Sequence, residues 1–360
     1  MKRIVLLLVA AFVLICLPAV AEETDGDCLY TLLGPDGQML TMRAGRMYEG
    51  DEYISSDDQL YRVVSVDDVN MTATAEYLGK AQIDPAASTA FHSLIASAAS
   101  EKKIAMYSTH SDESYIPSDG DYSLEEDAGI YDVGNSFKEN LEKLGIEVEY
   151  SEETFLPHDA GAYRRSRRVA EELIKDGPDA IFDIHRDGVP AEQYETTVDG
   201  EETSMVRLFV GRSNPNSQAN RAFAQEVKAA ADEEYPGLIK DIYIGKGNYN
   251  QELYPQSLLL EFGTHEIDKD LAINSTEYMA EVINEVVFGG SAKAEEKTSV
   301  PEEGKAVSSG IFWVIGIAVV AAVVYALAST GKFKSIWHKI KRSSSEITGG
   351  MFGEKPEKKK

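Results

Sequence analysis

Five side chains suited to hydrolytic chemistry follow short apolar runs of the sequence. They are His110, Glu113, His185, Arg186 and Glu261. Neutral imidazole and carboxylate are ligands that suit Zn²⁺, and a catalytic zinc site needs three protein ligands with a fourth position left for water. His110, Glu113 and His185 supply three such ligands. The spacing of His110 and Glu113 lets one turn after a strand point both side chains at one ion.

Glu261 and Arg186 complete the candidate catalytic set. A carboxylate in a cleft beside zinc can accept a proton from water, whose pKa a zinc ion lowers to about 7. Glu261 could equally be a strand-end carboxylate held by backbone donors. Arg186, next to His185, could hold a substrate carboxylate or stabilise an oxyanion. His265 could be a ligand, a hydrogen-bond donor in the transition state, or a surface residue.

The elements that must position these residues alternate between strand and helix. Such alternation predicts an α/β fold with a mostly parallel sheet and helices on both faces, in which ligand sites form at the carboxyl ends of the strands. The predicted strands are 103–109, 146–150, 180–184, 205–210 and 257–260. The predicted helices are 129–144, 163–176, 217–235 and 275–287. Short β-type runs separated by turn signals precede them and predict a small antiparallel β-rich domain.

Two apolar segments predict the topology of the chain. Residues 4–17 follow two basic residues and precede small residues ending at Ala21, the pattern of a secretory signal. Residues 311–329 carry no charge over 19 positions and precede a lysine-rich cluster, which indicates a membrane-spanning helix with a cytoplasmic basic tail. The predicted organisation is a signal peptide (1–21), a small β-rich domain (22–83), a connecting helix (84–100), a catalytic domain (101–288), a flexible linker (289–310), a transmembrane helix (311–329) and a basic tail (330–360).

Composition excludes several classes of function. The formal net charge of −26 makes nucleic acid a poor partner, because phosphate binding needs excess positive charge. The two cysteines, Cys16 and Cys28, cannot build a disulfide framework. Together with the two apolar segments described above, the sequence predicts a location at the cell membrane, with one span and the catalytic domain outside the cytoplasm.

Several separate strings resemble one protein family. They are IAMYSTHSDESYIPSDG (104–120), YRRSRRVAEELIKDGPDAIFDIHRD (163–187), VGRSNPN (210–216) and YNQELYPQSLLLEFG (249–263). Together they resemble stage II sporulation protein P, an exported peptidoglycan hydrolase of endospore-forming Firmicutes. That family is similar to zinc-dependent N-acetylmuramoyl-L-alanine amidases, which have a carboxypeptidase-like α/β fold with a His, Glu, His metal site and a catalytic Glu. By motif, His110, His185 and Glu261 take the two histidine places and the catalytic place.

The resemblance implies an activity and a set of partners. It implies hydrolysis of the amide between N-acetylmuramic acid and L-alanine and of peptide cross-links, during engulfment of the forespore. It also implies partnership with a lytic transglycosylase and a membrane scaffold. In those amidases the ligand glutamate lies farther along the chain, where this sequence offers Glu125 and Glu126, whereas the position within THSDES favours Glu113. The family has an N-terminal membrane anchor, so the C-terminal span predicted here differs from it.

Two other functions fit the same residues. One is a metallocarboxypeptidase that trims stem peptides, and the other is a catalytically inactive module that binds the cell wall. Product analysis on purified sacculi separates the enzymes, because an amidase frees whole peptides and a carboxypeptidase releases single amino acids. The presence of His110, His185 and Glu261 argues against an inactive module.

Overall fold

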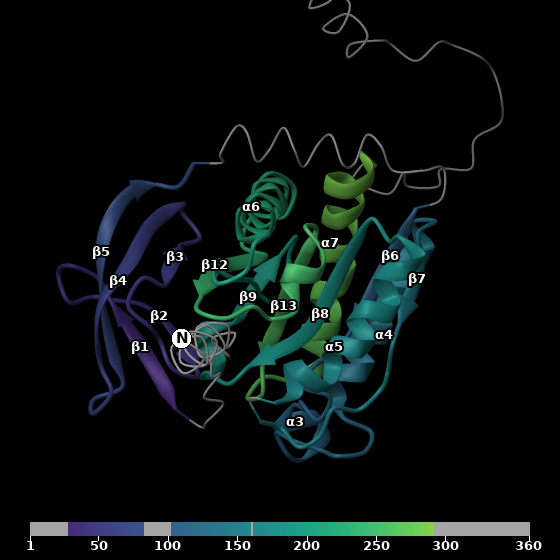
Figure 1. The fold of residues 1–360 in the computed structure, drawn as a ribbon, viewed down its shortest axis with the longest axis horizontal. Coiled ribbons are helices and arrows are strands. Elements are labelled where there is room, and N and C mark those ends of the chain that lie inside the picture. The colour runs from purple at the N-terminus through teal and green to yellow at the C-terminus, as the bar shows by residue number, and fades with distance from the viewer. Residues whose placement is uncertain (1–27, 83–101, 160, 291–360) are drawn as a thin grey trace, which may run out of the picture. The chain divides into compact units, whose positions relative to one another are not determined.

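A computed structural model describes residues 28–82, 102–159 and 161–290 (Figure 1). The predicted signal peptide, connecting helix, transmembrane helix and basic tail lie outside these ranges, as does most of the predicted linker. Among the helices that the structure describes, none combines the length and apolar character needed to cross a membrane.

The described strands form one sheet of eleven strands and a separate hairpin. The early strands are β1 (Leu29–Leu33), β2 (Met39–Ala44), β3 (Glu52–Ile54), β4 (Gln59–Asp67) and β5 (Thr72–Lys80). The later strands are β6 (Lys103–Tyr107), β7 (Glu147–Tyr150), β8 (Ala180–Asp187), β9 (Glu195–Val198), β10 (Glu201–Ser204), β11 (Val206–Gly211), β12 (Ile239–Gly245) and β13 (Ser257–Thr264). In the sheet the order is β2-β1-β5-β4-β3-β12-β11-β13-β8-β6-β7, and the hairpin pairs β9 with β10.

The later part of the sheet is mostly parallel, as predicted. Strands β7, β6, β8 and β13 run in parallel to one another. Strand β11 is antiparallel to β13 and parallel to β12. Strand β12 is absent from the sequence prediction. Strands β8 and β13 run three and four residues beyond their predicted ends, so His185 and Glu261 lie inside strands rather than after them.

Helices cover both faces of this part of the sheet. They are α3 (Ile116–Asp119), α4 (Gly129–Lys143), α5 (Ala162–Leu173), α6 (Ser217–Glu234) and α7 (Lys269–Phe288), with short 3-10 helices η1 (Ile174–Asp176), η2 (Ala191–Gln193) and η3 (Gln251–Leu253). Helices α4, α6 and α7 share one core with the sheet, and α5 packs on the opposite face. Helix α4 buries Ile130, Val133, Phe137 and Leu141, a spacing that places all four on one side of a helix. Helix α7 begins where the Asp268 side chain accepts a hydrogen bond from the Asp270 backbone N–H.

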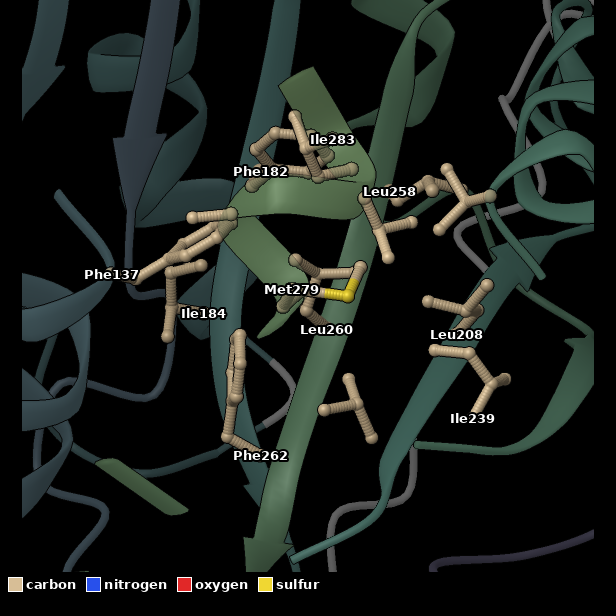
Figure 2. Close-up of a cluster of buried hydrophobic side chains, with 14 of the residues drawn as sticks. Phe137, Phe182, Ile184, Leu208, Ile239, Leu258, Leu260, Phe262, Met279 and Ile283 are labelled. Atoms are coloured by element: carbon tan, nitrogen blue, oxygen red, sulfur yellow. The ribbon is translucent and has the colours of Figure 1, made fainter. Parts of the chain in front are cut away.

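The two faces of the central strands have opposite character, because successive side chains of a strand point to opposite sides. On the face toward α4 and α7 the strands present apolar side chains, which form the largest core (Figure 2). These include Phe182, Ile184, Leu208, Leu258, Leu260 and Phe262. The alternate positions include a group of polar and charged side chains toward the carboxyl ends of β8 and β13 and on the neighbouring β11 and β12, namely His185, Asp187, Arg207, Asp241 and Glu261. The candidate site therefore lies on the polar face.

The N-terminal strands belong to the same sheet as the α/β elements. Strand β3 pairs with β12 in antiparallel fashion, from Ile54 opposite Ile242 to Glu52 opposite Ile244. Side chains of β1, β3, β4 and β5 also form a second core with residues of β11, β12 and β13. The sequence predicts two domains, 22–83 and 101–288. That boundary stays a prediction, but the described strands on its two sides share one sheet and one core.

Candidate metal centre and active-site cleft

Three buried residues converge on one point of the polar face. They are His110, Glu113 and His185, and one ligand atom from each lies within 4.8 Å of the others. The Nδ1 atoms of both histidines lie 3.3 Å from the same oxygen, Glu113 Oε1. Two imidazole nitrogens and one carboxylate oxygen form a donor set that fits Zn²⁺ with one position open. The structure thus brings together the three residues that the sequence analysis selected.

The loop that carries His110 and Glu113 is held by buried hydrogen bonds. It follows β6, and residues 108–114 are all buried although every one is polar. The Thr109 backbone N–H and hydroxyl both donate to Asp183, at 2.8 and 2.7 Å. The Ser111 hydroxyl accepts from the Phe155 N–H, and the Ser114 hydroxyl accepts from the Gly129 N–H. Polar residues are needed here because a buried turn must satisfy its backbone groups without strand partners.

Two neighbours orient the candidate ligands. His185 Nε2 lies 3.0 Å from Asp183 Oδ1, and the Nδ1 edge of the ring faces Glu113. The Arg186 backbone N–H donates to the second oxygen of Glu113 at 2.9 Å. Burial alone would raise the pKa of Glu113, but the positive charges of His185 and Arg186 hold that pKa well below its usual range. The carboxylate is therefore ionised, as a metal ligand must be.

The alternative ligands Glu125 and Glu126 are exposed. Neither belongs to the group of converging ligand atoms found among the described residues. The geometry favours Glu113 over both of them.

Glu261 projects from β13 beside the converging triad. In the parallel pairing of β13 with β8, Glu261 lies opposite His185. Burial and the nearby negative charge of Asp187 raise the pKa of Glu261 to about 7, against the lowering effect of Arg207. A carboxyl group with that pKa can accept a proton at neutral pH and release it again.

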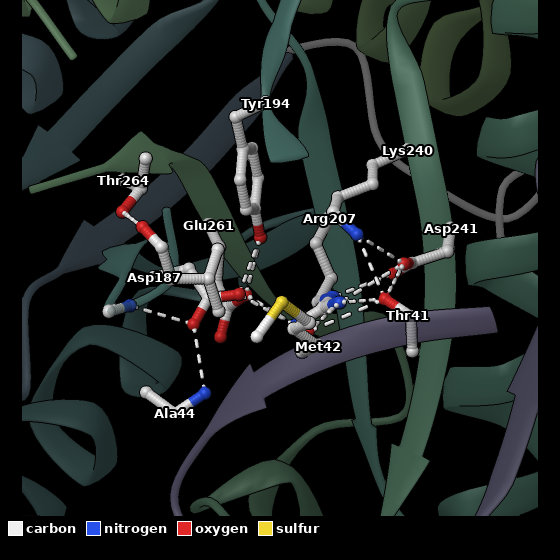
Figure 3. A network of polar contacts seen from close by, with 12 residues as sticks. Thr41, Met42, Ala44, Asp187, Tyr194, Arg207, Lys240, Asp241, Glu261 and Thr264 are labelled. Atoms are coloured by element: carbon white, nitrogen blue, oxygen red, sulfur yellow. Dashed lines mark hydrogen bonds and ion pairs between the residues drawn. The ribbon is translucent and has the colours of Figure 1, made fainter. Parts of the chain in front are cut away.

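A buried polar network holds Glu261 in place (Figure 3). The Tyr194 hydroxyl lies 2.9 Å from Glu261 Oε2 and 3.0 Å from Asp187 Oδ2. Arg207 is fully buried; it donates to Asp187 at 2.7 Å and to both oxygens of Asp241 at 2.7 and 3.1 Å. Its remaining donors bind Thr41 and the Met42 carbonyl of β2. The network therefore links the candidate base to the N-terminal strands.

Arg186 and His265 both line the cleft. The Arg186 guanidinium donates to the backbone carbonyls of Ser114 at 3.2 Å and Tyr122 at 2.7 Å, so it fixes the loop that carries the triad. Its predicted contact with substrate stays a prediction. His265 is half-buried, and burial lowers the pKa of its imidazole. Its Nδ1 lies 3.3 Å from the Thr264 hydroxyl.

The cleft has a volume of about 680 Å³, and several of its lining residues were not selected from the sequence. His158 stacks on His110 with ring centroids 4.0 Å apart, and its Nδ1 lies 3.0 Å from Asp112 Oδ1. Tyr163 and Tyr249 supply aromatic walls. The remaining wall comes from β2 and the residues after it, among them Arg43 and Arg46. No local motif marks His158, Arg43 or Arg46, because each of them joins the cleft only through long-range contacts.

The fold and the cleft define a mixed α/β protein with a buried site of two histidines and one carboxylate that could hold a divalent metal. A family model described as Stage II sporulation protein P matches residues 31–284. The chain belongs to that family, which confirms the resemblance found in the sequence.

Individual relatives are more distant. Stage II sporulation protein P of Bacillus subtilis (strain 168) is 29% identical over 182 residues, which cover 45% of this chain and 45% of that protein. The match thus spans less than half of the relative's length.

Solved structures similar to part of the chain are amidases. N-acetylmuramoyl-L-alanine amidase AmiC2 of Nostoc punctiforme is 16% identical, with a TM-score of 0.33, over 53% of this chain and 98% of that chain. The N-acetylmuramoyl-L-alanine amidase from Clostridium difficile 630 is 13% identical, with a TM-score of 0.34, over 53% of this chain and 97% of that chain. The CwlD amidase from Clostridioides difficile, solved in complex with the GerS lipoprotein, is 12% identical, with a TM-score of 0.35, over 52% and 96%.

Proposed function

We propose that the protein is a zinc-dependent peptidoglycan hydrolase that acts during forespore engulfment. In this proposal it cleaves the amide between N-acetylmuramic acid and L-alanine, and peptide cross-links of the same polymer. The observation that carries the proposal is the convergence of His110 and His185 on one oxygen of Glu113, beside Glu261 in the same cleft. Membership of the sporulation protein family supports the developmental setting.

Each of these residues would have a separate role in hydrolysis. His110, Glu113 and His185 would hold zinc, which when bound polarises an amide carbonyl and makes water more acidic. Glu261 accepts the proton that the attacking water loses and returns it to the departing amine. Tyr194 carries a single phenolic proton, so it can donate to only one of Asp187 and Glu261. When the Tyr194 hydroxyl donates to Asp187, its oxygen can accept a hydrogen bond from the protonated form of Glu261.

Metal analysis tests the metal part of the proposal. Full-length protein purified in detergent should contain about one Zn²⁺ per chain, as three ligands and one open position require. His110→Ala and His185→Ala should each lose it and lose hydrolysis of purified sacculi. His158→Ala is the matched control, because this exposed histidine stacks on the His110 ring but directs its Nδ1 to Asp112 and not to Glu113, so its loss should leave zinc in place. Undiminished zinc in both ligand variants would contradict the assignment.

Analysis of the sacculus products tests the reaction. Release of whole stem peptides from glycan supports amidase action, and shortened cross-links support endopeptidase action. Release of single amino acids instead would identify the metallocarboxypeptidase. Zinc binding without any released product would favour a module that only binds the wall.

The proposed location is the cell membrane, with residues 311–329 as a single span and the cleft outside the cytoplasm. The lysine-rich segment after Ser329 favours this orientation, because such clusters stay on the cytoplasmic side. In this setting a lytic transglycosylase and a membrane scaffold are the proposed partners.

Protease added to intact cells stripped of their wall should digest the region of the cleft and leave 330–360 protected. An epitope at each end of the chain makes the two fragments distinguishable. Protection of the cleft region together with loss of the tail would mean the opposite orientation.

A further inference from the structure

One wall of the cleft carries two cations that form no ion pair within the described ranges, Arg43 and Lys246. The cations that line the cleft are Arg43, Arg46, Arg186 and Lys246. Arg46 forms an ion pair with Asp68, whereas within the described ranges Arg43 and Lys246 form none. This is unusual for a chain with 61 acidic and 35 basic residues, in which carboxylates are abundant. Cations that line a cleft and lack an ion-pair partner attract anionic ligands.

Arg43 is held as an open donor group. Its guanidinium lies over the rings of Phe209 and Tyr243, 5.0 and 5.2 Å from their centroids. Within the described part of the chain it donates one hydrogen bond, from Nη1 to the Arg46 carbonyl at 2.7 Å. Its Nε–H is buried and has no acceptor among the residues that the structure describes. A guanidinium that is fixed by aromatic rings but short of acceptors is suited to a carboxylate, which can take two of its donors at once.

Lys246 lies on the loop that follows β12, on the same side of the cleft. Its Nζ lies 4.4 Å from the centroid of the Tyr48 ring, and the Arg46 guanidinium lies 4.5 Å from the same centroid. The backbone N–H of Lys246 donates to Asp51 Oδ1 at 2.9 Å, which anchors the loop. Lys246 is exposed, and its ammonium group forms no ion pair with the residues that the structure describes.

The register of the sheet places this wall near the candidate base. Arg207 lies opposite Glu261, and Phe209 lies opposite Leu259, in the antiparallel pairing of β11 with β13. Phe209 and Arg207 are two residues apart on one face, a separation of roughly 7 Å. The Arg43 guanidinium over Phe209 is thus displaced from Glu261 by a distance that one or two residues of an extended peptide would span.

We infer that Arg43 and Lys246 form a subsite for a carboxylate of the substrate peptide, located one or two residues from the bond that is cleaved. The inference rests on the proposed function for its reaction, but the binding it describes is separate from catalysis. It gives the N-terminal strands a role in substrate selection, because β2 supplies Arg43.

The test compares two soluble substrates with the full-length protein. One is N-acetylmuramyl-L-alanyl-D-glutamate, and the other is the same compound with both carboxylates converted to carboxamides. Arg43→Gln should raise KM for the acid by about 10- to 100-fold and leave kcat and the KM for the amide unchanged, because it removes a charge-assisted hydrogen bond. Arg43→Lys and Lys246→Gln should raise KM for the acid less.

Arg46→Gln is the matched control, since this cation also lines the cleft but is paired with Asp68; it should leave the preference for the acid unchanged. Thermal unfolding and zinc content show whether each variant is folded. If Arg43→Gln does not fold, the KM values of Arg43→Lys and Lys246→Gln test the inference instead. An unchanged ratio of KM values in the folded Arg43 and Lys246 variants would overturn the inference. If the protein cleaves neither compound, the proposed function fails, but titration calorimetry with the acid still tests the subsite. Weaker binding of the acid by Arg43→Gln than by wild type supports the inference, and equal binding overturns it.

Discussion

Glu261→Gln is expected to leave zinc bound while hydrolysis of sacculi falls by about 10²- to 10⁴-fold. Glutamine keeps the shape of the side chain and can still bond to the Tyr194 hydroxyl, but it cannot accept a proton from water. Zinc content by metal analysis and the rate of peptide release from sacculi measure the two effects on one preparation.

The matched variant is Glu113→Gln, which should have the opposite primary effect. It removes the charged oxygen toward which both imidazoles point, so zinc should be lost first and activity with it. If Glu261→Gln lost zinc and Glu113→Gln kept it, the two roles would be exchanged. If Glu113→Gln were silent and Glu125→Gln or Glu126→Gln lost zinc, the ligand would lie farther along the chain.

The raised pKa of Glu261 gives the same assignment a pH signature. Only the ionised carboxylate can accept a proton, and burial and Asp187 raise the pKa of Glu261 to about 7. Activity should therefore fall about tenfold per pH unit below the midpoint of this titration and level off above it. The charge of a bound metal moves that midpoint below 7. Residual activity of Glu261→Gln should lack this acidic limb.

Arg207→Met is expected to reduce the free energy of unfolding by about 3–5 kcal/mol. The substitution keeps much of the side-chain volume but leaves Asp187 buried without a cation and Asp241 with Lys240 alone. Burial alone would raise the pKa of Asp241, and the charges of Arg207 and Lys240 instead lower it to about 2. Urea unfolding followed by circular dichroism measures the loss.

Arg62→Met is the control for the Arg207 variant. Arg62 pairs with Glu52 at the surface, with 46% of its side chain exposed, so its loss should cost about 1 kcal/mol or less. The double variant Arg207→Met with Asp241→Asn should be destabilised by less than the sum of the two single variants. In the double variant the Asp241 charge is removed together with the Arg207 charge that it pairs with. Equal losses for Arg207→Met and Arg62→Met would show that the buried network contributes little to stability.

The sequence predicts those elements whose pattern is set by local burial. The predicted and observed bounds of α4 and α6 differ by one residue at the C-terminal end, since each has a continuous apolar stripe. Strands β8 and β13 were predicted too short because charged site residues interrupt their apolar runs. Strand β12 contains the charged residues Lys240 and Asp241, so its sequence does not resemble a core strand. Both are buried, and they form hydrogen bonds with each other, Arg207 and Thr41.

The same reasoning explains which site residues could be selected from the sequence. His110 and Glu113 follow β6, and His185 lies near the carboxyl end of the neighbouring strand β8, so local pattern and general sheet geometry suffice to group them. Tyr194, Arg207 and Arg43 come from three other parts of the chain and meet the site through side-chain contacts. Nothing in their immediate neighbours indicates that they approach Glu261 or the cleft.

The pairing of β3 with β12 has a consequence for any attempt to shorten this protein. Without residues 28–82, β12 would become the edge of the sheet, and the backbone groups that now pair its residues 242–244 with β3 would lose their partners. Such edges recruit other chains by strand addition, and natural proteins protect them with charges, bulges or covering segments. The same truncation would expose Phe209, Tyr243 and Leu259, which now lie in the second core. An excised α/β region should therefore self-associate into aggregates, and a soluble monomer would require the N-terminal strands to be supplied in trans.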